Sequence, residues 1–242
     1  MIVIVPAFQE GARIRKTLML LKHELSKGNI HGVVVVDDGS TDRTHFISSE
    51  FARTNTGFSV LKHDSNLGKA DAIITGLFHA KQEDATIAIL LDADLHRYSD
   101  NAFEQLLNPL HDQHIQMVVG AAVEGKGNEP RHLLSGQRAL RLTALNPLFV
   151  GKPKWVGLLK GRRFGVEVAL NRLIPTKATV LSDAVFFHAS PFRSRNDELT
   201  NMGVGNQTRE MFEVKSAIEE RDFEARKKKF ERDEKRRLPR QT

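Results

Sequence analysis

Short apolar runs alternate with longer segments of helical periodicity over the first half of the chain. The apolar runs are typical of buried strands and span residues 2–5, 33–36, 58–61, 87–91 and 115–120. Between them, apolar residues recur at three- and four-residue spacing and predict helices over 10–27, 42–53, 68–80 and 101–110. This alternation predicts an α/β fold with a mostly parallel sheet covered by helices on both faces.

The pattern loosens after residue 120. It predicts a loop over 124–130, a helix over 133–148, a connector over 152–163, a short helix over 165–173 and a strand over 179–187. From residue 200 the sequence becomes polar and then strongly charged. We therefore predict one domain over 1–199 and a charged, helical C-terminal extension over 200–242.

The extension carries the whole excess of positive charge. The chain has 36 Lys and Arg against 30 Asp and Glu, but residues 226–240 hold nine basic and three acidic side chains, so the remainder is balanced at 27 of each. The body therefore lacks the basic surface that nucleic-acid binding would need. For the extension, the alternatives are a solvated helix, a contact in a homo-oligomer or with a partner, and a peripheral contact with an anionic membrane.

Cysteines and long apolar stretches are both missing from the sequence. Without cysteine, disulfides, thiol catalysis and zinc–thiolate sites are excluded. No run approaches the roughly 18 apolar residues that cross a bilayer, and the opening MIVIVPAF lacks the features of a signal peptide. These features favour a cytoplasmic protein, either free or peripheral on the inner face of the membrane.

Polar clusters follow four of the predicted strands, at residues 7–10, 37–41, 64–69 and 92–96. The carboxyl ends of parallel strands meet at one edge of a sheet, and ligands of α/β proteins bind at that edge. The sequence therefore predicts that these four loops form a single site.

Asp92 and Asp94 give the sharpest local signal. Two carboxylates separated by one residue can both bind a hard divalent cation, which prefers oxygen ligands and keeps water or substrate phosphates. His96, two residues further on, could add a ligand. The alternative is that these acidic residues only end a buried strand, as turn or cap residues.

Two further loops fit an anionic nucleotide. Asp37 and Asp38 follow a buried strand, where a carboxylate can accept hydrogen bonds from a base or a ribose, although a receiver-like phosphoacceptor would also fit. Lys69 follows Gly68 at the start of a predicted helix, where N–H groups and an ammonium can face an anion. The chain has no Walker A loop and no G-x-G-x-x-G after the first strand, which argues against a P-loop or a dinucleotide cofactor.

Four residues of the second half carry candidate chemistry. Arg193 and Arg195 follow the last predicted strand, where they could neutralise a leaving diphosphate or simply be exposed loop residues. Glu167 and Asp183 are isolated carboxylates near apolar segments. Each is therefore either a general base or a structural partner.

Five segments, in order and spacing, resemble family 2 glycosyltransferases of the GT-A fold, which is a Rossmann-like architecture: VIVPAFQEGARI, VVVVDDGSTDRT, NLGKADAIITGL, ILLDADLH and SGQRALR. The likeness covers residues 2–171 and is strongest to the dolichyl- and polyprenyl-phosphate mannosyl- and glucosyltransferase branch. By position, it implies nucleotide-sugar contacts from Pro6, Ala7, Phe8, Glu10, Asp38, Lys69, Asp92, Ala93, Asp94, Arg193 and Arg195. It also implies a metal on Asp92, Asp94 and His96, and an acceptor side at Ser135, Gly136 and Arg138.

The resemblance further implies a reaction. It indicates metal-dependent, inverting transfer of a hexose from a UDP- or GDP-sugar, with Mn²⁺ or Mg²⁺. The acceptor is either polyprenyl phosphate or a small or glycan hydroxyl, because the basic residue that close family members carry after the equivalent of 117–122 is missing here. Only a hydroxyl acceptor would need a base, for which Asp183 and Glu167 are the candidates. The alternative is a degenerate relative that binds a nucleotide sugar without transferring it.

Overall fold

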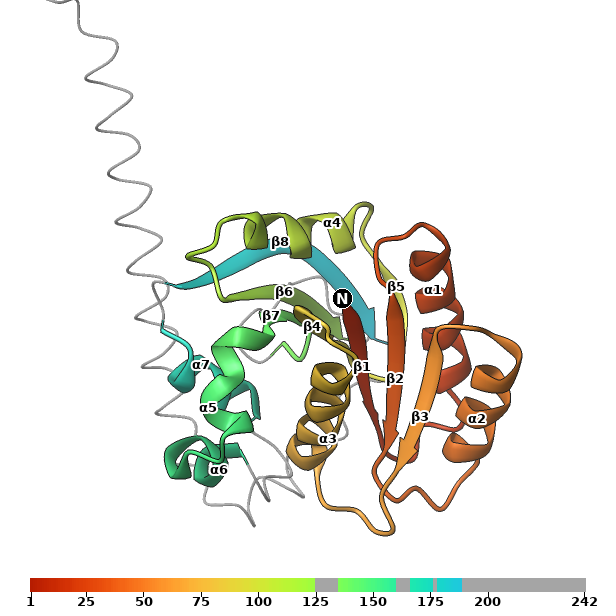
Figure 1. Ribbon diagram of the computed structural model, residues 1–242. Coiled ribbons are helices and arrows are strands. Elements are labelled where there is room, and N and C mark those ends of the chain that lie inside the picture. The colour runs from red at the N-terminus through yellow and green to blue at the C-terminus, as the bar shows by residue number, and fades with distance from the viewer. Residues whose placement is uncertain (125–134, 160–165, 176–177, 189–242) are drawn as a thin grey trace, which may run out of the picture.

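A computed structural model of the chain describes residues 1–124, 135–159, 166–175 and 178–188. Eight strands of this part of the chain form one sheet: β1 (Ile2–Ala7), β2 (Gly32–Asp37), β3 (Phe58–Lys62), β4 (Ile87–Leu90), β5 (Leu95–Tyr98), β6 (Met117–Glu124), β7 (Arg138–Arg141) and β8 (Thr179–His188). The helices are α1 (Ile14–Ser26), α2 (Thr44–Thr54), α3 (Lys69–Gln82), α4 (Ala102–Leu107), α5 (Asn146–Phe149), α6 (Pro153–Leu159) and α7 (Val166–Leu173). Figure 1 shows their arrangement.

The sheet is mostly parallel, as the sequence predicts. Its strand order is β3-β2-β1-β4-β7-β6-β8-β5. Six strands run in the same direction: β1, β2, β3, β4, β6 and β8. β7 and β5 run against them, because each pairs antiparallel with its neighbours. The carboxyl ends of six strands therefore meet at one edge, together with the amino end of β7.

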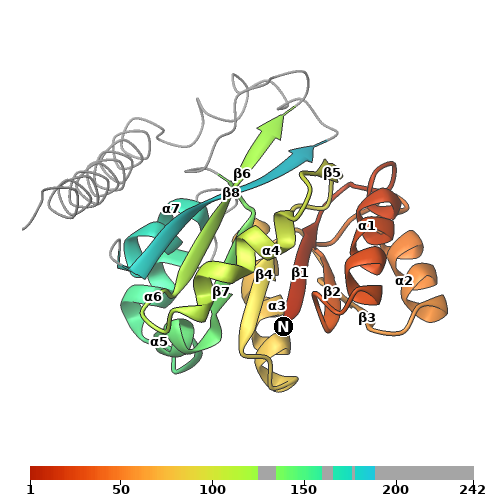
Figure 2. The same ribbon diagram turned by 90° about the horizontal axis from the view of Figure 1, so that it is seen from above.

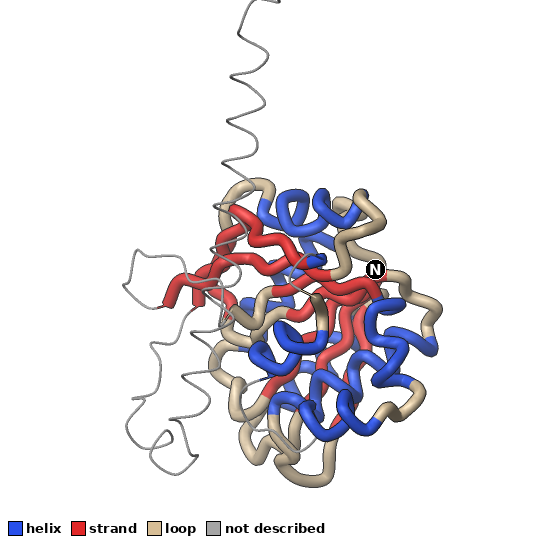
Figure 3. Tube along the Cα trace, turned by 90° about the vertical axis from the view of Figure 1, so that its left-hand side faces the viewer, coloured by secondary structure: helices blue, strands red, loops and turns tan. Residues whose placement is uncertain are grey.

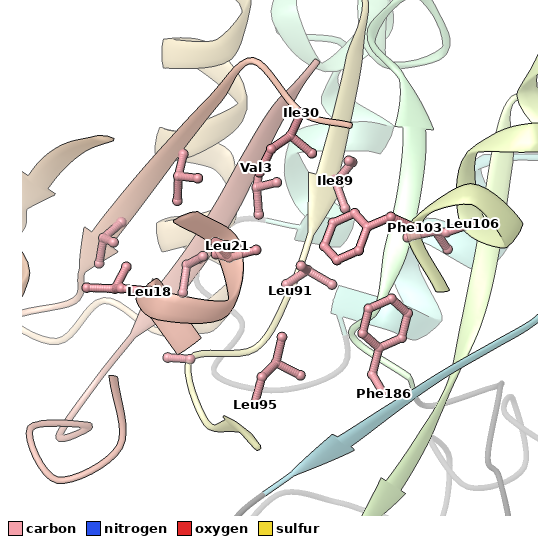
Figure 4. Close-up of a cluster of buried hydrophobic side chains, with 14 of the residues drawn as sticks. Val3, Leu18, Leu21, Ile30, Ile89, Leu91, Leu95, Phe103, Leu106 and Phe186 are labelled. Atoms are coloured by element: carbon pink, nitrogen blue, oxygen red, sulfur yellow. The ribbon is translucent and has the colours of Figure 1, made fainter. Parts of the chain in front are cut away.

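Helices cover both faces of the sheet, which runs through the middle of the molecule (Figures 2 and 3). Successive strand residues point to opposite faces. Accordingly, Val3 and Val5 of β1 belong to a buried cluster with α1, α2 and α4 (Figure 4), and Ile4 belongs to a second cluster with α3 and α7. Strand β1 is thus buried on both sides, which explains why its sequence is a continuous apolar run.

Three details differ from the sequence prediction. Residues 138–141, predicted as part of a helix over 133–148, form strand β7, and the helical part is limited to a 3₁₀ turn (Leu142–Leu145) and α5. β5 had no counterpart in the prediction, and the predicted connector over 152–163 contains helix α6. The predicted extension over 200–242 and its boundary at residue 199 lie outside the described residues.

Candidate active site

The loops after β1 and β2 are joined by the side chain of Gln9. Its amide nitrogen donates to Thr41 Oγ1 at 2.9 Å, and its Oε1 accepts from the backbone N–H of Asp42 at 3.1 Å. Glu10 N donates to Thr44 Oγ1 at 2.7 Å, which extends the same contact by one residue. These bonds fix the backbone of the predicted nucleotide loop, in which Ala7 is buried and Phe8 is 42% exposed.

Asp38 is buried and binds the backbone of the loop between β3 and α3. Its carboxylate accepts hydrogen bonds from the backbone N–H of Leu67 at 2.9 Å and of Gly68 at 2.8 Å, and His63 Nδ1 lies 2.8 Å away. Gly39 has φ of +70°, and a Cβ there would approach Ser65 C to 2.4 Å, so only glycine allows this close approach. The loop that leads into α3 is therefore fastened to the end of β2 by the carboxylate predicted to contact the nucleotide.

Lys69 begins α3 and lies between two carboxylates. Its Nζ is 2.7 Å from Asp92 Oδ1 and 2.8 Å from Glu167 Oε1 of α7. The side chains of Lys69 and Asp92 are each about a quarter exposed, at 26%, so this ion pair lies at the surface of the site and not in the core. Two predicted carboxylates, one from the loop after β4 and one from α7, thus meet at the ammonium of Lys69.

A hydrogen-bonded relay connects Asp92 with Asp94. Gln137 Nε2 lies 2.7 Å from Asp92 Oδ2 and 3.2 Å from His188 Nε2. His188 Nδ1 in turn lies 2.7 Å from Asp94 Oδ1. The Gln137 amide can donate one N–H to each neighbour if His188 carries its proton on Nδ1. Asp92 and Asp94 are therefore held by the side chain of the residue just before β7 and by that of the last residue of β8.

The charges of this cluster shift the pKa values of its members. Burial opposes the charged form of Asp92, but the Lys69 ammonium and His188 hold the pKa of that carboxyl below its usual range. Burial also opposes charging of His188, yet its bond to Asp94 leaves the His188 pKa raised. Burial raises the pKa of Glu10 despite its contact with Arg13, and the nearby Asp94 and Asp92 add to that effect. The site thus gathers the carboxylates of Glu10, Asp92 and Asp94 close to the positive charges of Lys69 and His188.

Two of the predicted acceptor-side residues, Ser135 and Arg138, are buried. Ser135 is buried, and its Oγ accepts from the backbone N–H of Gln137 at 3.1 Å. Arg138 is fully buried and donates to Ser135 O at 2.9 Å and to Asn171 Oδ1 at 2.6 Å. Burial lowers the pKa of Arg138 to about 10, against the charges of Glu167 and Asp92. Arg138 thus links the segment before β7 to α7 from a buried position, and the acceptor-side role of Ser135, Gly136 and Arg138 stays a prediction.

Gly136 fits against the carboxylate and the ammonium. A Cβ there would lie 2.7 and 2.8 Å from the two Asp92 oxygens and 2.9 Å from Lys69 Nζ. We expect Gly136→Ala to displace both groups, at a cost of about 1–3 kcal/mol in stability, and to weaken nucleotide binding roughly tenfold or more. Thermal unfolding and calorimetric titration check this. Gly157→Ala is the control, because a Cβ added there would meet no other atom within 4 Å. Equal effects from both variants would contradict the prediction.

Several predicted residues are not brought into the cluster. His96 lies at a register shift between Leu95 and Arg97, and Lys16 Nζ contacts its Nδ1 at 2.7 Å. Asp183 is exposed in the middle of β8 and lies roughly 16–17 Å along the strand from His188 at 3.3 Å per residue. Ala93 is buried and its carbonyl accepts from Thr17 Oγ1 at 2.7 Å. Pro6 is partly exposed at the end of β1. Arg193 and Arg195 lie outside the described residues.

Two members of the cluster were missed by the sequence prediction. Gln137 lies inside the SGQRALR segment between two residues that were predicted, and no charge or spacing marked it as different. His188 had a weak signal, because it ends the last predicted strand and the carboxyl ends of strands meet at the site. A cavity of about 570 Å³ at the opposite edge, beside Glu24 and Tyr98, contains none of the cluster residues.

The comparison with known families agrees with this geometry. The model of glycosyl transferase family 2 matches residues 2–172. The chain belongs to this family. Relatives include a UDP-N-acetylglucosamine–dolichyl-phosphate N-acetylglucosaminyltransferase of Methanococcus voltae, which is 28% identical over 50% of this chain and 51% of its own length. A dolichyl-phosphate β-glucosyltransferase of Trichomonas vaginalis is 35% identical over 38% of this chain and 29% of its own length. The chain thus spans about half the length, or less, of these curated relatives.

Solved structures confirm the predicted GT-A fold. A mannosyltransferase from Pyrobaculum calidifontis, in complex with GDP-Man and Mn²⁺, has a TM-score of 0.56 at 21% identity, covering 80% of this chain and 57% of that one. A glucosyl-3-phosphoglycerate synthase from Mycobacterium tuberculosis, in complex with Mn²⁺ and UDP-glucose, has a TM-score of 0.56 at 19% identity, covering 90% and 78%. The family and fold predicted from the sequence are therefore confirmed.

Proposed function

We propose that this chain transfers a hexose from a UDP- or GDP-sugar, with inversion and with the help of Mn²⁺ or Mg²⁺. The observation that supports this most is the cluster in which Lys69, Asp92, Gln137, His188 and Asp94 are joined at the carboxyl edge of the sheet. The Mn²⁺ and nucleotide sugars in the complexes of the two structural neighbours are consistent with the same chemistry.

The donor set fits a divalent cation that arrives with its substrate. Among the described residues, no three acidic or histidine side chains gather as a ready metal cage. However, within the described residues only Oδ1 of Asp94 makes a contact, so Oδ2 is open to a ligand. Asp92 is linked to Asp94 through Gln137 and His188. Asp92 and Asp94 would hold the ion, and diphosphate oxygens would complete its coordination. Both ring nitrogens of His188 already contact Asp94 and Gln137, so His188 would orient Asp94 and not bind the ion. When bound, the ion would neutralise the diphosphate as it leaves.

The remaining side chains would position the donor. Lys69 stands in the first turn of α3, where the helix N-terminus also favours negative charge. A diphosphate there would be drawn to the ammonium that now balances Asp92 and Glu167. The loop that Asp38 fastens carries the Leu67 and Gly68 N–H groups, so Asp38 would keep Lys69 in place. The contacts predicted for Arg193 and Arg195 stay predictions.

Glu167 is favoured over Asp183 as the general base of a hydroxyl acceptor. Its carboxylate lies at the cluster, 2.8 Å from Lys69, whereas Asp183 is exposed in the middle of β8. A phosphate acceptor, which the dolichyl-phosphate relatives favour, is already a nucleophile and needs no base.

The two acceptor classes predict different results for Glu167→Gln. Turnover should fall about 10²–10⁴-fold with a hydroxyl acceptor, because the base is lost. It should change little with polyprenyl phosphate. Steady-state kinetics with both acceptors decides between them, and Asp183→Asn, which should leave both rates unchanged, is the control. A loss of activity only in Asp183→Asn would contradict the assignment.

Gln137 should set the metal affinity of the site. Gln137→Met keeps the side-chain length but removes the donors to Asp92 and His188, so we expect Mn²⁺ binding in the presence of nucleotide to weaken about 10–100-fold. Electron paramagnetic resonance of free Mn²⁺ measures this directly. Gln105→Met, at an exposed position of α4, should bind Mn²⁺ as the parent does. Unchanged Mn²⁺ affinity in Gln137→Met would show that the relay does not position the ligands.

Calorimetric titration with UDP, GDP, UDP-glucose and GDP-mannose, each with and without Mn²⁺, tests the proposal. We expect metal-dependent binding of one nucleotide and release of sugar from its hexose derivative when an acceptor is present. Binding without sugar transfer to any acceptor would indicate the degenerate relative instead. No binding of any nucleotide would refute the proposed function.

A further inference from the structure

One face of the molecule combines exposed apolar side chains with lysines. It lies where the second half of α3 meets α5, which leads on to α6 (Figure 1). We call it the lysine–aromatic face, and define it by Phe78, Lys81, Phe149, Val150, Lys152 and Trp155. Phe78 is 40% exposed and Val150 is 68% exposed, and both are among the large hydrophobic residues of the described chain that water reaches most.

Two aromatic rings of this face are in contact, and Phe149 and Trp155 are both partly buried against the core. The rings of Phe78 and Phe149 pack edge to face, with centroids 5.2 Å apart, although they come from helices far apart in sequence. Lys81 Nζ lies 4.3 Å from the Phe149 centroid. Gly151, at φ of +69°, ends α5 and turns the chain into α6, with Lys152 and Lys154 exposed on the far side of the turn. Val150 is thus an exposed apolar side chain next to Phe149 in sequence and two residues before Lys152.

The segment that supplies Phe149, Val150, Lys152 and Trp155 carries charge of one sign, whereas α3 is followed by the exposed acidic residues Glu83 and Asp84. Residues 130–166 contain no Asp or Glu, although the chain outside the C-terminal extension is balanced overall. Two copies of this chain would bring like charges together if they met through this face, which disfavours a symmetric dimer. A surface that is negatively charged and accepts apolar side chains fits it better.

We propose that the lysine–aromatic face docks on the surface of an anionic lipid bilayer. At the headgroup level, Trp and Phe rings enter the apolar boundary while lysine stems extend their ammonium groups to the phosphates. The lysines add electrostatic attraction to anionic lipids. This inference goes beyond the proposed function, because it concerns where the protein sits and not the sugar it moves. It is also separate from the basic extension, which lies outside the described residues.

Trp155 allows a direct test, because it is the only tryptophan of the chain. We expect its emission in the full-length protein to shift to shorter wavelength on vesicles of phosphatidylcholine mixed with phosphatidylglycerol. Brominated lipids should quench it, and phosphatidylcholine alone should do neither. In the triple variant Lys81→Glu, Lys152→Glu and Lys154→Glu, vesicle affinity should fall roughly a hundredfold.

The control variant makes the same change in net charge elsewhere. Arg15→Glu, Lys22→Glu and Lys62→Glu lie at exposed positions of α1 and β3, and they should leave the Trp155 shift and most of the affinity in place. Equal losses in both triple variants, or vesicle binding without a Trp155 shift, would overturn the proposal, because attachment would then be general or through the extension. A dimer in lipid-free light scattering that only the face variant abolishes would also overturn it.

Nucleotide titration separates this proposal from the proposed function. Both triple variants should bind nucleotide with Mn²⁺ as the parent does, which shows that they are folded. If the parent binds no nucleotide, the proposed function fails, and the Trp155 result still decides whether this face docks on lipid.

Discussion

Asp94→Ala should abolish sugar transfer and remove the metal dependence of nucleotide binding. In the structure, Asp94 is anchored by His188 through Oδ1 at 2.7 Å, and its other oxygen has no partner among the described residues. The variant keeps the fold but removes one of two proposed carboxylate ligands. A metal that neutralises a leaving diphosphate contributes several kcal/mol, so kcat/KM should fall by at least about a thousandfold. Rates of nucleoside diphosphate release, measured over a series of Mn²⁺ concentrations, check this.

The control for Asp94→Ala is Asp183→Ala, which removes a carboxylate of the same type from an exposed position of β8. It should keep the parent rate and the parent Mn²⁺ dependence. A chelator should reduce the parent to the level of Asp94→Ala, and added Mn²⁺ should restore only the parent. If the parent kept full activity in excess chelator, the metal would be unnecessary and Asp94 would have another role.

The parallel half of the sheet could be predicted from the sequence because its signals are local. β1, β2 and β4 are buried on both faces, so their sequences are uninterrupted apolar runs. An amphipathic helix instead has apolar residues every three or four positions. β7 has no such run. Arg138 and Arg141 flank two apolar residues, a pattern that also fits a helix with polar residues on one side. One of the partners of Arg138 in this buried strand is Asn171, 33 positions away, which sequence spacing does not reveal.

The candidate site divides in the same way. Asp92, Asp94 and Lys69 each follow a strand or begin a helix, so the general rule for the carboxyl edge places them near one another. Their partners come from distant segments: Gln137 lies 45 positions after Asp92, and His188 lies 94 after Asp94. Spacing along the chain favoured His96 as the nitrogen neighbour. However, the register shift at 95–97 breaks the regular pairing there, and the imidazole beside Asp94 comes from β8 instead.

Lys69→Met should lower both stability and donor binding. The substitution keeps the stem but leaves Asp92 and Glu167, which lie 2.7 and 2.8 Å from the ammonium, without their shared cation. Breaking a fully buried pair costs about 3–5 kcal/mol, and because these side chains are partly exposed we expect about 2 kcal/mol at neutral pH. That corresponds to a melting temperature lower by roughly 4–8 °C for a chain of this size. Thermal unfolding measures it, and nucleotide affinity should fall as well, because Lys69 is the cation proposed to face the diphosphate.

The stability loss in Lys69→Met should depend on pH in a defined direction. Burial works against Lys69, but the two carboxylates raise its pKa above 10.5, so its contribution is complete below that pH and fades only above it. The same ammonium helps to hold the pKa of Asp92 below 3.8 against burial, so that contribution is complete above pH 3.8 and is lost as the pH falls through the folded value. The difference between parent and variant should therefore stay constant from about pH 5 to 9 and shrink in acid.

A double-mutant cycle tests whether this loss comes from the ion pair. Adding Asp92→Asn to Lys69→Met removes one of the two stranded charges, so the double variant should be more stable than the sum of the single effects, by about 0.5–3 kcal/mol. Lys22→Met, at an exposed position of α1, should leave stability unchanged at every pH. If the destabilisations of the two single variants simply added up in the double variant, Lys69 and Asp92 would not be energetically coupled. A loss in Lys69→Met that does not shrink at all as the pH falls below 3.8 would assign its cause to packing of the lysine stem and not to charge.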